Sequence, residues 1–506
     1  MSATDSRTFK AGMLASGQTL SACVGLVTYV VLSHVLSPEN YATYRKTLFA
    51  FAFAAPLLML GLPQALYYFL PDERERARGV LLENVILLAL MGAVFSLFLL
   101  FGGNRLLALR FGNRSLERTL LILAPYPLFV LPAAAVSACL MARGRAWELA
   151  VYNVFSRLLA FVLVVGACVV WRTTEAAVIG VIAAAAIALF PALALMFRCT
   201  RDSESVVTPA GMLAQLRYSV PLGLAGMMGT ISWAVDKFIV ASMCSNEDFA
   251  IYANGAIEIP LISMVTGSVA AVLLPDLARF YKGGERGEAV ALWRRGAAKC
   301  ALIIFPAMCM LFFLAPEIMT VLFPKKVGGA AGEVAFYRAS SVPFRFYLLV
   351  LPIRIVTFGS MLKAAGRGPL VLAASVGAVV VNAILSIVLV GYMGYAGAAL
   401  GTVLMMYLWT VPFYLVVISG VYGTRLRDLL PYGALARIMA ASVACSLLFV
   451  AKRYLVHAWG DLACVVVLGP AYAGVVLVLF ARMRLVDWEA LRRSVARTLS
   501  RGRPKG

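Results

Sequence analysis

The chain has 506 residues, of which 62% are hydrophobic and 14% charged, and its formal net charge is +21. A soluble globular protein carries roughly 25% charged residues, and a disordered chain needs low hydrophobicity, so the composition excludes both classes. The basic residues do not gather in one patch, which argues against a nucleic-acid-binding protein.

Long apolar segments separated by short polar links run through the whole chain. Because a helix that crosses a bilayer needs about 20 mostly apolar residues, we predict an all-α polytopic membrane protein with about 14 transmembrane helices. The predicted spans are 11–34, 46–69, 80–103, 117–141, 148–170, 175–197, 215–243, 249–274, 298–322, 335–361, 369–391, 395–419, 431–451 and 462–481.

The positive charges indicate the orientation, because cytoplasmic links of membrane proteins carry an excess of Lys and Arg. With a cytoplasmic N-terminus, 29 of the 45 Lys and Arg residues lie in or beside cytoplasmic links, 11 in or beside external ones, and five inside spans. One external link opposes this count, since Arg105, Arg110, Arg114 and Arg118 lie in or beside it. The excess of Lys and Arg in the links assigned to the cytoplasm predicts that both termini are cytoplasmic.

An internal repeat relates two parts of the chain. Ser37-Pro-Glu-Asn-Tyr-Ala-Thr-Tyr44 is similar to Ser245-Asn-Glu-Asp-Phe-Ala-Ile-Tyr252, and the span after each copy ends in Leu-Pro-Asp. Chance similarity of two polar links is the alternative interpretation. The lag of six spans predicts two six-helix lobes, with a substrate site where the two lobes meet. The predicted division is 1–200 and 201–422 for the lobes, 423–483 for two additional helices, and 484–506 for a basic cytoplasmic tail.

The tail after Arg482 combines arginines with apolar residues at helical spacing. This pattern is typical of an interfacial helix on an anionic membrane surface. A disordered basic tail is the alternative.

Four groups of residues, spread over both predicted lobes, resemble a known family. They are Leu36-Ser-Pro-Glu-Asn-Tyr-Ala-Thr-Tyr44; Gly61-Leu-Pro-Gln-Ala-Leu66; Val235-Asp-Lys-Phe-Ile239 with Ala250-Ile-Tyr252; and Gly366-Arg-Gly368 with Gly394-Tyr-Ala-Gly-Ala-Ala399. In their order and spacing the chain resembles the Wzx-type polysaccharide and O-antigen flippases of the multidrug/oligosaccharidyl-lipid/polysaccharide exporter superfamily.

The resemblance implies a MATE-like fold of two six-helix lobes around a central cavity. It also implies transport of a polyprenyl-diphosphate-linked oligosaccharide from the inner to the outer leaflet of the bacterial inner membrane, for lipopolysaccharide, O-antigen or exopolysaccharide synthesis. The implied partners are this lipid-linked glycan, membrane lipids, a glycan polymerase and glycosyltransferases. No nucleic acid is expected among them.

Arginines inside spans are candidates for binding the diphosphate, because intramembrane charges are costly and usually face a cavity or a partner. Arg157 lies near the middle of its span, and Arg345 and Arg354 share the tenth span, which Pro343 and Pro352 allow to bend. Arginine grips a phosphate bidentately, so these three residues are predicted to bind the substrate. The alternative is that Arg157 or Arg354 neutralises Glu258 or another carboxylate between helices.

Three more ionisable residues lie in spans seven and eight. Lys237 is predicted to bind the substrate, or alternatively to extend outward to the membrane surface. Asp236 and Glu258 are predicted to take up H⁺ or Na⁺ and to couple this uptake to transport. Pairing of Asp236 with a basic neighbour, as a gate or a brace, is the alternative.

Enzyme chemistry finds no support in the sequence. His34 and His457 lie near span ends, and no phosphate-binding glycine loop, HExxH pattern or nucleophile elbow occurs. The nine cysteines have no metal-ligand or redox spacing, and we interpret them as small buried apolar residues. No cofactor or metal is predicted.

Three other functions are compatible with the same sequence. A related carrier would flip the peptidoglycan precursor lipid II. A MATE-like antiporter would exchange a cation for a drug, although the predicted basic cavity disfavours cationic drugs. A non-transporting protein would act as a membrane scaffold for glycan-synthesis enzymes.

Overall fold

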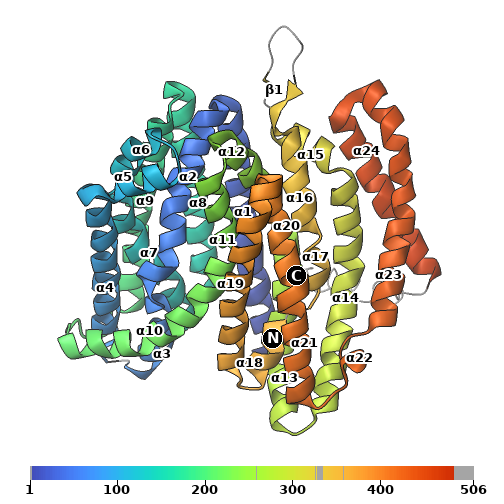
Figure 1. The fold of residues 1–506 in the computed structure, drawn as a ribbon. Helices are drawn as coiled ribbons and strands as arrows, with labels where there is room; N and C mark the ends of the chain where they lie inside the picture. Colours follow the sequence, from blue (N-terminus) through green and yellow to red (C-terminus); the bar gives the residue numbers. More distant parts are fainter. Residues whose placement is uncertain are drawn as a thin grey trace, which may run out of the picture. The chain divides into compact units, whose positions relative to one another are not determined.

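The structure is a computed structural model, and it describes residues 3–73, 75–257, 259–324, 326–327, 334–356 and 358–483. Apart from two strands of two residues each, the secondary structure of these residues is helical (Figure 1). Among the described residues, nine helices are long and apolar enough to cross a membrane, or up to 11 if two bent pairs each count as one span. The chain is therefore an all-α polytopic membrane protein, as predicted, while the count of fourteen spans stays a prediction.

Two compact units make up the chain. Unit 1 comprises Met1–Met264, Lys325–Val327 and Arg367–Phe413, and unit 2 comprises Val265–Pro324, Gly328–Gly366 and Tyr414–Gly506. The division into 1–200, 201–422, 423–483 and 484–506 stays a prediction. The basic tail in 484–506 lies outside the described residues.

Unit 1 combines the N-terminal helices with two long helices from late in the sequence. Its elements are α1 (Ala3–Val35), α2 (Pro38–Met59), α3 (Leu62–Asp72), α4 (Ala77–Phe98), η1 (Leu99–Gly103), α5 (Asn104–Arg110), α6 (Ser115–Leu123), α7 (Tyr126–Ala142), α8 (Ala146–Trp171), α9 (Thr174–Cys199), α10 (Pro209–Ser232), α11 (Val235–Met243), α12 (Asn246–Gly255), α19 (Gly368–Met393), α20 (Tyr395–Met405) and η3 (Met406–Thr410). In this unit α8 packs between α1 and α9, and α19 packs on α10, α11 and α20.

Unit 2 begins within α13 (Pro260–Lys282) and is built around α14. Its remaining elements are α14 (Arg286–Phe313), α15 (Ala315–Leu322), η2 (Phe336–Ser340), α16 (Ser341–Leu348), α17 (Leu351–Arg354), α18 (Phe358–Ala364), α21 (Val411–Tyr422), α22 (Leu426–Leu429), α23 (Tyr432–Cys445), η4 (Ser446–Ala451) and α24 (Lys452–Arg482). In the sequence, the strands β1 (Lys326–Val327) and β2 (Val334–Ala335) lie between α15 and η2. In this unit α14 packs against α16, α17 and α23, and α24 packs against α15 and α23.

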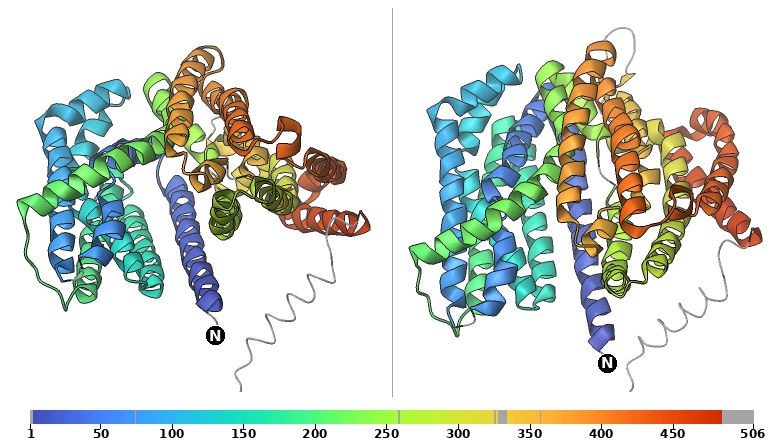
Figure 2. Two further views of the ribbon diagram at one scale, coloured as in Figure 1. Left: turned by 90° about the horizontal axis from the view of Figure 1, so that it is seen from below. Right: turned by 60° about the horizontal axis from the view of Figure 1, so that its bottom comes forward.

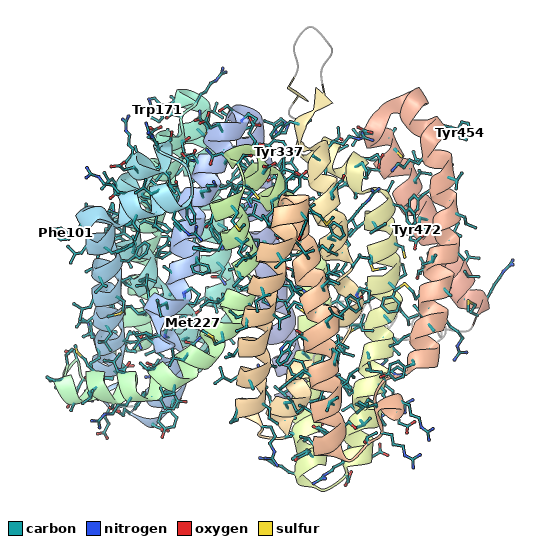
Figure 3. The ribbon with its side chains drawn as sticks, viewed as in Figure 1. Phe101, Trp171, Met227, Tyr337, Tyr454 and Tyr472 are labelled. Carbon is teal, nitrogen blue, oxygen red and sulfur yellow. The ribbon has the colours of Figure 1, made fainter. Side chains whose placement is uncertain are left out.

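Large apolar side chains cover the outside of the helices, as a lipid-facing surface requires. In unit 1, Phe101 and Trp171 point away from the helices and are 85% and 66% exposed (Figure 3). In unit 2, Tyr454 points outward while Tyr472 is buried (Figure 3). Exposed apolar surface on this scale is unusual for a soluble monomer and is expected in a bilayer, where acyl chains are the solvent.

Both copies of the repeated segment start a helix by the same mechanism. The Ser37 hydroxyl accepts a hydrogen bond from the backbone N–H of Asn40 (3.2 Å), and the Ser245 hydroxyl accepts one from the backbone N–H of Asp248 (3.0 Å). The Asp248 carboxylate accepts the Ser245 backbone N–H in return, which completes a capping box. The repeated Ser and the polar residue three positions later are therefore helix-start signals.

The two copies also pack against each other within unit 1, where α2 contacts α12. The Tyr41 hydroxyl and the Arg45 guanidinium both donate to the Asn254 amide oxygen (2.6 and 3.3 Å). The Lys46 ammonium donates to the Asn246 amide oxygen (2.8 Å). The contact between α2 and α12 is therefore polar, and the cations Arg45 and Lys46 donate there to neutral amide oxygens.

The helix α10 runs obliquely across the other helices of unit 1 (Figure 2). It crosses the break between α2 and α3, where Leu60 and Gly61 have left-handed backbone conformations (φ 45° and 73°). A Cβ on Gly61 would lie 2.6 Å from the Ser219 carbonyl oxygen, and a Cβ on Gly223 would overlap the backbone of Leu60. Glycine at both positions therefore permits the crossing.

The Gly223→Ala substitution tests this crossing. We expect it to lower the unfolding temperature of the purified protein in detergent, because an inserted methyl group in a tight contact costs about 1–3 kcal/mol. Gly226→Ala is the matched control on α10, since its Cβ would meet no atom within 4 Å. Equal melting curves for the two variants would contradict the proposed close packing.

Candidate functional site

A cavity of about 610 Å³ lies inside unit 1, between the packed helices that carry its polar lining. The polar groups that line it are hydroxyls, one amide and one guanidinium. They belong to Ser21, Thr28, Tyr29, Tyr44, Tyr126, Ser137, Tyr152, Asn153, Ser156 and Arg157. Apolar groups make up most of the remaining lining. A cavity of this size with hydroxyls and one cation among apolar groups suits a ligand that has a polar, anionic part.

Arg157, which was predicted from its position in the sequence, is the cation in this lining. It lies mid-way along α8, and its side chain is exposed rather than packed among apolar groups. Its charge acts on the Tyr126 phenol, which lines the same cavity. Among the described residues no carboxylate forms an ion pair with Arg157. Glu258, the carboxylate named in the alternative, lies outside these residues, so neutralisation of Arg157 by Glu258 stays an alternative prediction.

Arg45 is a second cation next to the cavity, and the sequence analysis placed it in a link instead. Its guanidinium lies over the ring of Tyr29, 4.1 Å from the ring centroid, and Tyr29 lines the cavity. Arg45 also donates to the Tyr41 hydroxyl (2.8 Å) and to the Ala253 carbonyl (2.9 Å). These partners are neutral, so the positive charge of Arg45 is not cancelled by them.

Lys46, the next residue, is fully buried. Its ammonium donates to the Phe111 carbonyl (3.0 Å) and to Asn246, and it lies 5.4 Å from the centroid of the Phe249 ring. A buried ammonium is strongly disfavoured unless it is paired or hydrogen-bonded. Lys46 thus adds another positive charge whose described hydrogen-bond partners are neutral.

Asp236, the predicted coupling residue on α11, is the centre of a buried network and is 1% exposed. Its carboxylate accepts hydrogen bonds from the Tyr252 hydroxyl (2.6 Å), the Thr402 hydroxyl (3.2 Å) and the backbone N–H of Lys237 (2.7 Å). These bonds join α11 to α12 and α20. Coupling by Asp236, and its alternative of pairing with a basic neighbour, both stay predictions.

The network continues from Thr402 to α19. The Thr402 and Ser386 hydroxyls both reach the Asn382 amide oxygen (3.4 and 2.9 Å), and the Asn382 amide nitrogen donates to the Ser232 carbonyl (3.1 Å). Side-chain oxygens of Asp236, Thr402, Asn382 and Ser386 therefore form one connected, buried cluster. Oxygen donors of this kind suit a hard cation or a proton. In the described part of the chain, no group of three or more His, Cys, Asp or Glu side chains is placed to hold a metal ion.

The other predicted residues lie elsewhere. Lys237 is half-buried beside Asp236. Arg345 on α16 and the half-buried Arg354 on α17 belong to unit 2, where Arg345 donates to the Phe312 carbonyl (3.0 Å). Glu258 lies outside the described residues.

The tenth predicted span is bent, as its prolines predict: the segments Phe336–Leu348 and Leu351–Ala364 meet at 41°. Arg157 belongs to unit 1, and Arg345 and Arg354 belong to unit 2. That all three face one cavity stays a prediction.

The family described as polysaccharide biosynthesis protein matches residues 9–281, which is more than half of the chain. The chain belongs to this polysaccharide biosynthesis protein family. The matched region of this family member contains Arg45, Lys46, Arg157 and Asp236.

A curated relative, the probable lipid II flippase MurJ of Rhizobium meliloti (strain 1021), is 26% identical over 218 residues. The match covers 40% of this polysaccharide biosynthesis protein and 39% of that relative, so it spans about two fifths of each.

Two solved structures show which fold this polysaccharide biosynthesis protein has. A lipid II flippase MurJ in an inward closed conformation matches with a TM-score of 0.75 at 14% identity, over 93% of this chain and 99% of that chain. An inward-facing multidrug resistance MATE family transporter of the MOP superfamily matches with a TM-score of 0.58 at 16% identity, over 80% and 96%. The chain shares the fold of these transporters, which confirms the predicted MATE-like architecture.

Proposed function

We propose that this family member is a flippase that moves a polyprenyl-diphosphate-linked oligosaccharide from the inner to the outer leaflet of the bacterial inner membrane. The observation that carries the proposal is the cavity of unit 1, in which Arg157 forms no ion pair with a described carboxylate. A guanidinium that pairs with no described carboxylate inside a membrane protein is suited to an anionic ligand, and a diphosphate supplies paired acceptor oxygens.

The surroundings of Arg157 support the same ligand. Arg45, which lies over the ring of the lining residue Tyr29, adds positive potential beside the cavity. Hydroxyls of Tyr44, Tyr126 and other lining residues would bond to sugar hydroxyls, while the lipid tail stays in the bilayer. In this proposal Arg345, Arg354 and Lys237 add further contacts to the head group as the protein changes conformation.

Transport would proceed by alternating access, in which the two lobes rock about the bound head group. With both termini cytoplasmic, an inside-negative membrane potential favours outward movement of an anionic head group by about 2.3 kcal/mol per charge per 100 mV. The hydrogen bonds between the two repeat copies, Tyr41 and Arg45 to Asn254, are contacts that such a movement would break and remake.

Asp236 and the oxygen cluster around it are the proposed site of ion coupling, with Glu258 as a second carboxylate. Binding of Na⁺ or H⁺ would replace hydroxyl contacts of Asp236 and so alter how α11, α12, α19 and α20 are held together. A cation returning inward would then reset the empty carrier.

The proposed protein carries a substrate across the membrane and is not an enzyme, in keeping with the transporters and flippases whose fold it shares. Its proposed partners are glycosyltransferases, which would supply the lipid-linked glycan, and a glycan polymerase, which would consume it. The products would be lipopolysaccharide with O-antigen, or an exopolysaccharide.

Lipid II is the second candidate substrate, and the similarity to two MurJ proteins favours it. Lipid II also presents a diphosphate, so the cationic cavity does not separate the two. Expression of this chain in a strain depleted of its lipid II flippase decides between them. Restored growth would assign lipid II, and lysis would favour a different lipid-linked glycan.

The Arg157→Ala substitution tests the cationic site. In proteoliposomes we expect the rate at which a polyprenyl-diphosphate-linked oligosaccharide is flipped to fall by about tenfold or more, because a hydrogen bond to a charged group contributes about 1.5–3 kcal/mol. Arg345→Ala is expected to reduce the rate as well. Arg198→Ala is the control, since Arg198 is an exposed arginine at the end of α9. Unchanged flipping in both Arg157→Ala and Arg345→Ala would refute the assignment of the cations.

The Asp236→Asn substitution tests the coupling site. We expect flipping to lose its dependence on an imposed Na⁺ or H⁺ gradient, because the amide keeps hydrogen-bonding capacity but cannot carry the charge that attracts a cation. The rates with and without each gradient are measured in the same vesicles. A gradient dependence equal to that of the unmodified protein would show that Asp236 only braces the helices.

A further inference from the structure

Cys139 and Cys199 are sixty residues apart in the sequence but meet in space. Cys139 is in the last turn of α7, and Cys199 is the last residue of α9, which packs on α7. The side chains of Cys139 and Cys199 lie close enough to interact with each other, and both are free thiols. This pairing differs from our sequence interpretation of the cysteines as inert buried residues, because their spacing along the chain carries no sign of it.

An arginine is bonded to one of the two sulfurs. Arg145, the residue before α8, donates from Nη1 to the Cys199 sulfur at 3.0 Å and pairs through Nη2 with Glu148 at 2.5 Å. The hydrogen bond with Cys199 is the main cause that raises the pKa of Arg145. A guanidinium that donates to a sulfur favours the thiolate, which is the nucleophilic form of cysteine.

The location gives water access to Cys199. It ends α9 beside the polar link Arg201–Ser203, and its side chain is partly exposed, whereas Cys139 is fully buried. The positive charge pattern puts this link on the cytoplasmic side. One accessible, arginine-bonded sulfur beside one sheltered thiol is the arrangement of an attacking and a resolving cysteine.

We propose that Cys199 and Cys139 form a peroxide-reactive thiol pair, in which Cys199 is oxidised first and Cys139 then closes a disulfide between α7 and α9. The oxidant is hydrogen peroxide. The Cys199 thiolate attacks one peroxide oxygen, the O–O bond breaks, and the departing hydroxide takes up a proton to form water, which leaves a sulfenic acid on Cys199. The Cys139 sulfur then attacks the Cys199 sulfur, the S–O bond breaks, and the hydroxide leaves as water with the Cys139 proton.

This site is independent of the proposed transport activity, but it lies on the walls of the cavity. The helices α7 and α9 both line the cavity, and α8, whose first residues follow Arg145, carries Arg157. The disulfide would join the ends of the two helices on either side of α8, and so would restrain these walls in an oxidised cell.

The test maps the state of each cysteine in the full-length protein in lipid nanodiscs. After brief treatment with hydrogen peroxide, alkylation and peptide mass spectrometry, we expect a Cys139–Cys199 disulfide to form before any other cysteine is oxidised. In Cys139→Ser we expect a sulfenic acid on Cys199 that dimedone traps. Oxidation of Cys199 no faster than that of the exposed Cys23, or a disulfide that never forms, would overturn the proposal.

A second measurement isolates the contribution of Arg145. In Arg145→Gln we expect iodoacetamide to alkylate Cys199 about tenfold more slowly at a pH below the pKa of the thiol, where a rise of about one unit in that pKa lowers the thiolate fraction about tenfold. Arg145→Lys, which keeps the charge, is expected to retain most of the rate. Arg198→Gln removes an adjacent charge that makes no hydrogen bond to the sulfur, and is expected to change the rate less than about twofold. Equal rates in Arg145→Gln and Arg198→Gln would contradict the role of the hydrogen bond.

Discussion

Positive charge held by neutral partners inside a membrane-spanning unit is the constraint on which the account depends. Arg157 lines a cavity, Arg45 lies over a tyrosine that lines it, and Lys46 is buried beside Arg45. In a low-dielectric surrounding such charges are tolerated when water or an anion reaches them. The cavity has room for water and for an anion, and its hydroxyls can bond to either. The charge and the shape of unit 1 therefore both favour an anionic ligand.

The buried carboxylate of Glu83, also in unit 1, is paired with a cation. Its surroundings therefore differ from those of Arg157. Glu83 is fully buried and accepts hydrogen bonds from Arg76 (2.7 Å), from the Thr208 hydroxyl (3.1 Å) and from the Gln215 amide (3.1 Å). That cluster connects α4 to α10 and to the link before it, and it fits a structural role. Glu83 is thus paired with a cation, whereas no described carboxylate pairs with Arg157 in the cavity.

Much of the fold was predictable because the bilayer imposes a simple rule on the sequence. Long apolar segments become helices, and the repeat at residues 37–44 and 245–252 marks helix starts through Ser37 and Ser245. Arg157 was found because a charge in mid-span stands out against its neighbours. The bend of the tenth span followed from its prolines, since proline disrupts the helical hydrogen-bond ladder.

The rest depended on contacts between residues far apart in the chain. Arg45 looked like a link residue because it follows a polar segment, and only the packing of α2 on α12 brings its charge beside the cavity. The partners of Asp236 come from positions 252 and 402, whose Tyr and Thr are ordinary residues in a helix. The same holds for Cys139 and Cys199. A charged residue in an apolar segment can be recognised in a sequence. The neutral residues that bond to it can be recognised only once the tertiary packing is known.

The most direct test of the cationic cavity is an electron cryomicroscopy structure of the protein in lipid nanodiscs with a polyprenyl-diphosphate-linked oligosaccharide. The account predicts diphosphate density within hydrogen-bonding distance of the Arg157 guanidinium, at about 3 Å, with the sugar among the tyrosine hydroxyls. A diphosphate bound away from the cavity of unit 1, with Arg157 against acyl chains or joined to a carboxylate, would contradict it.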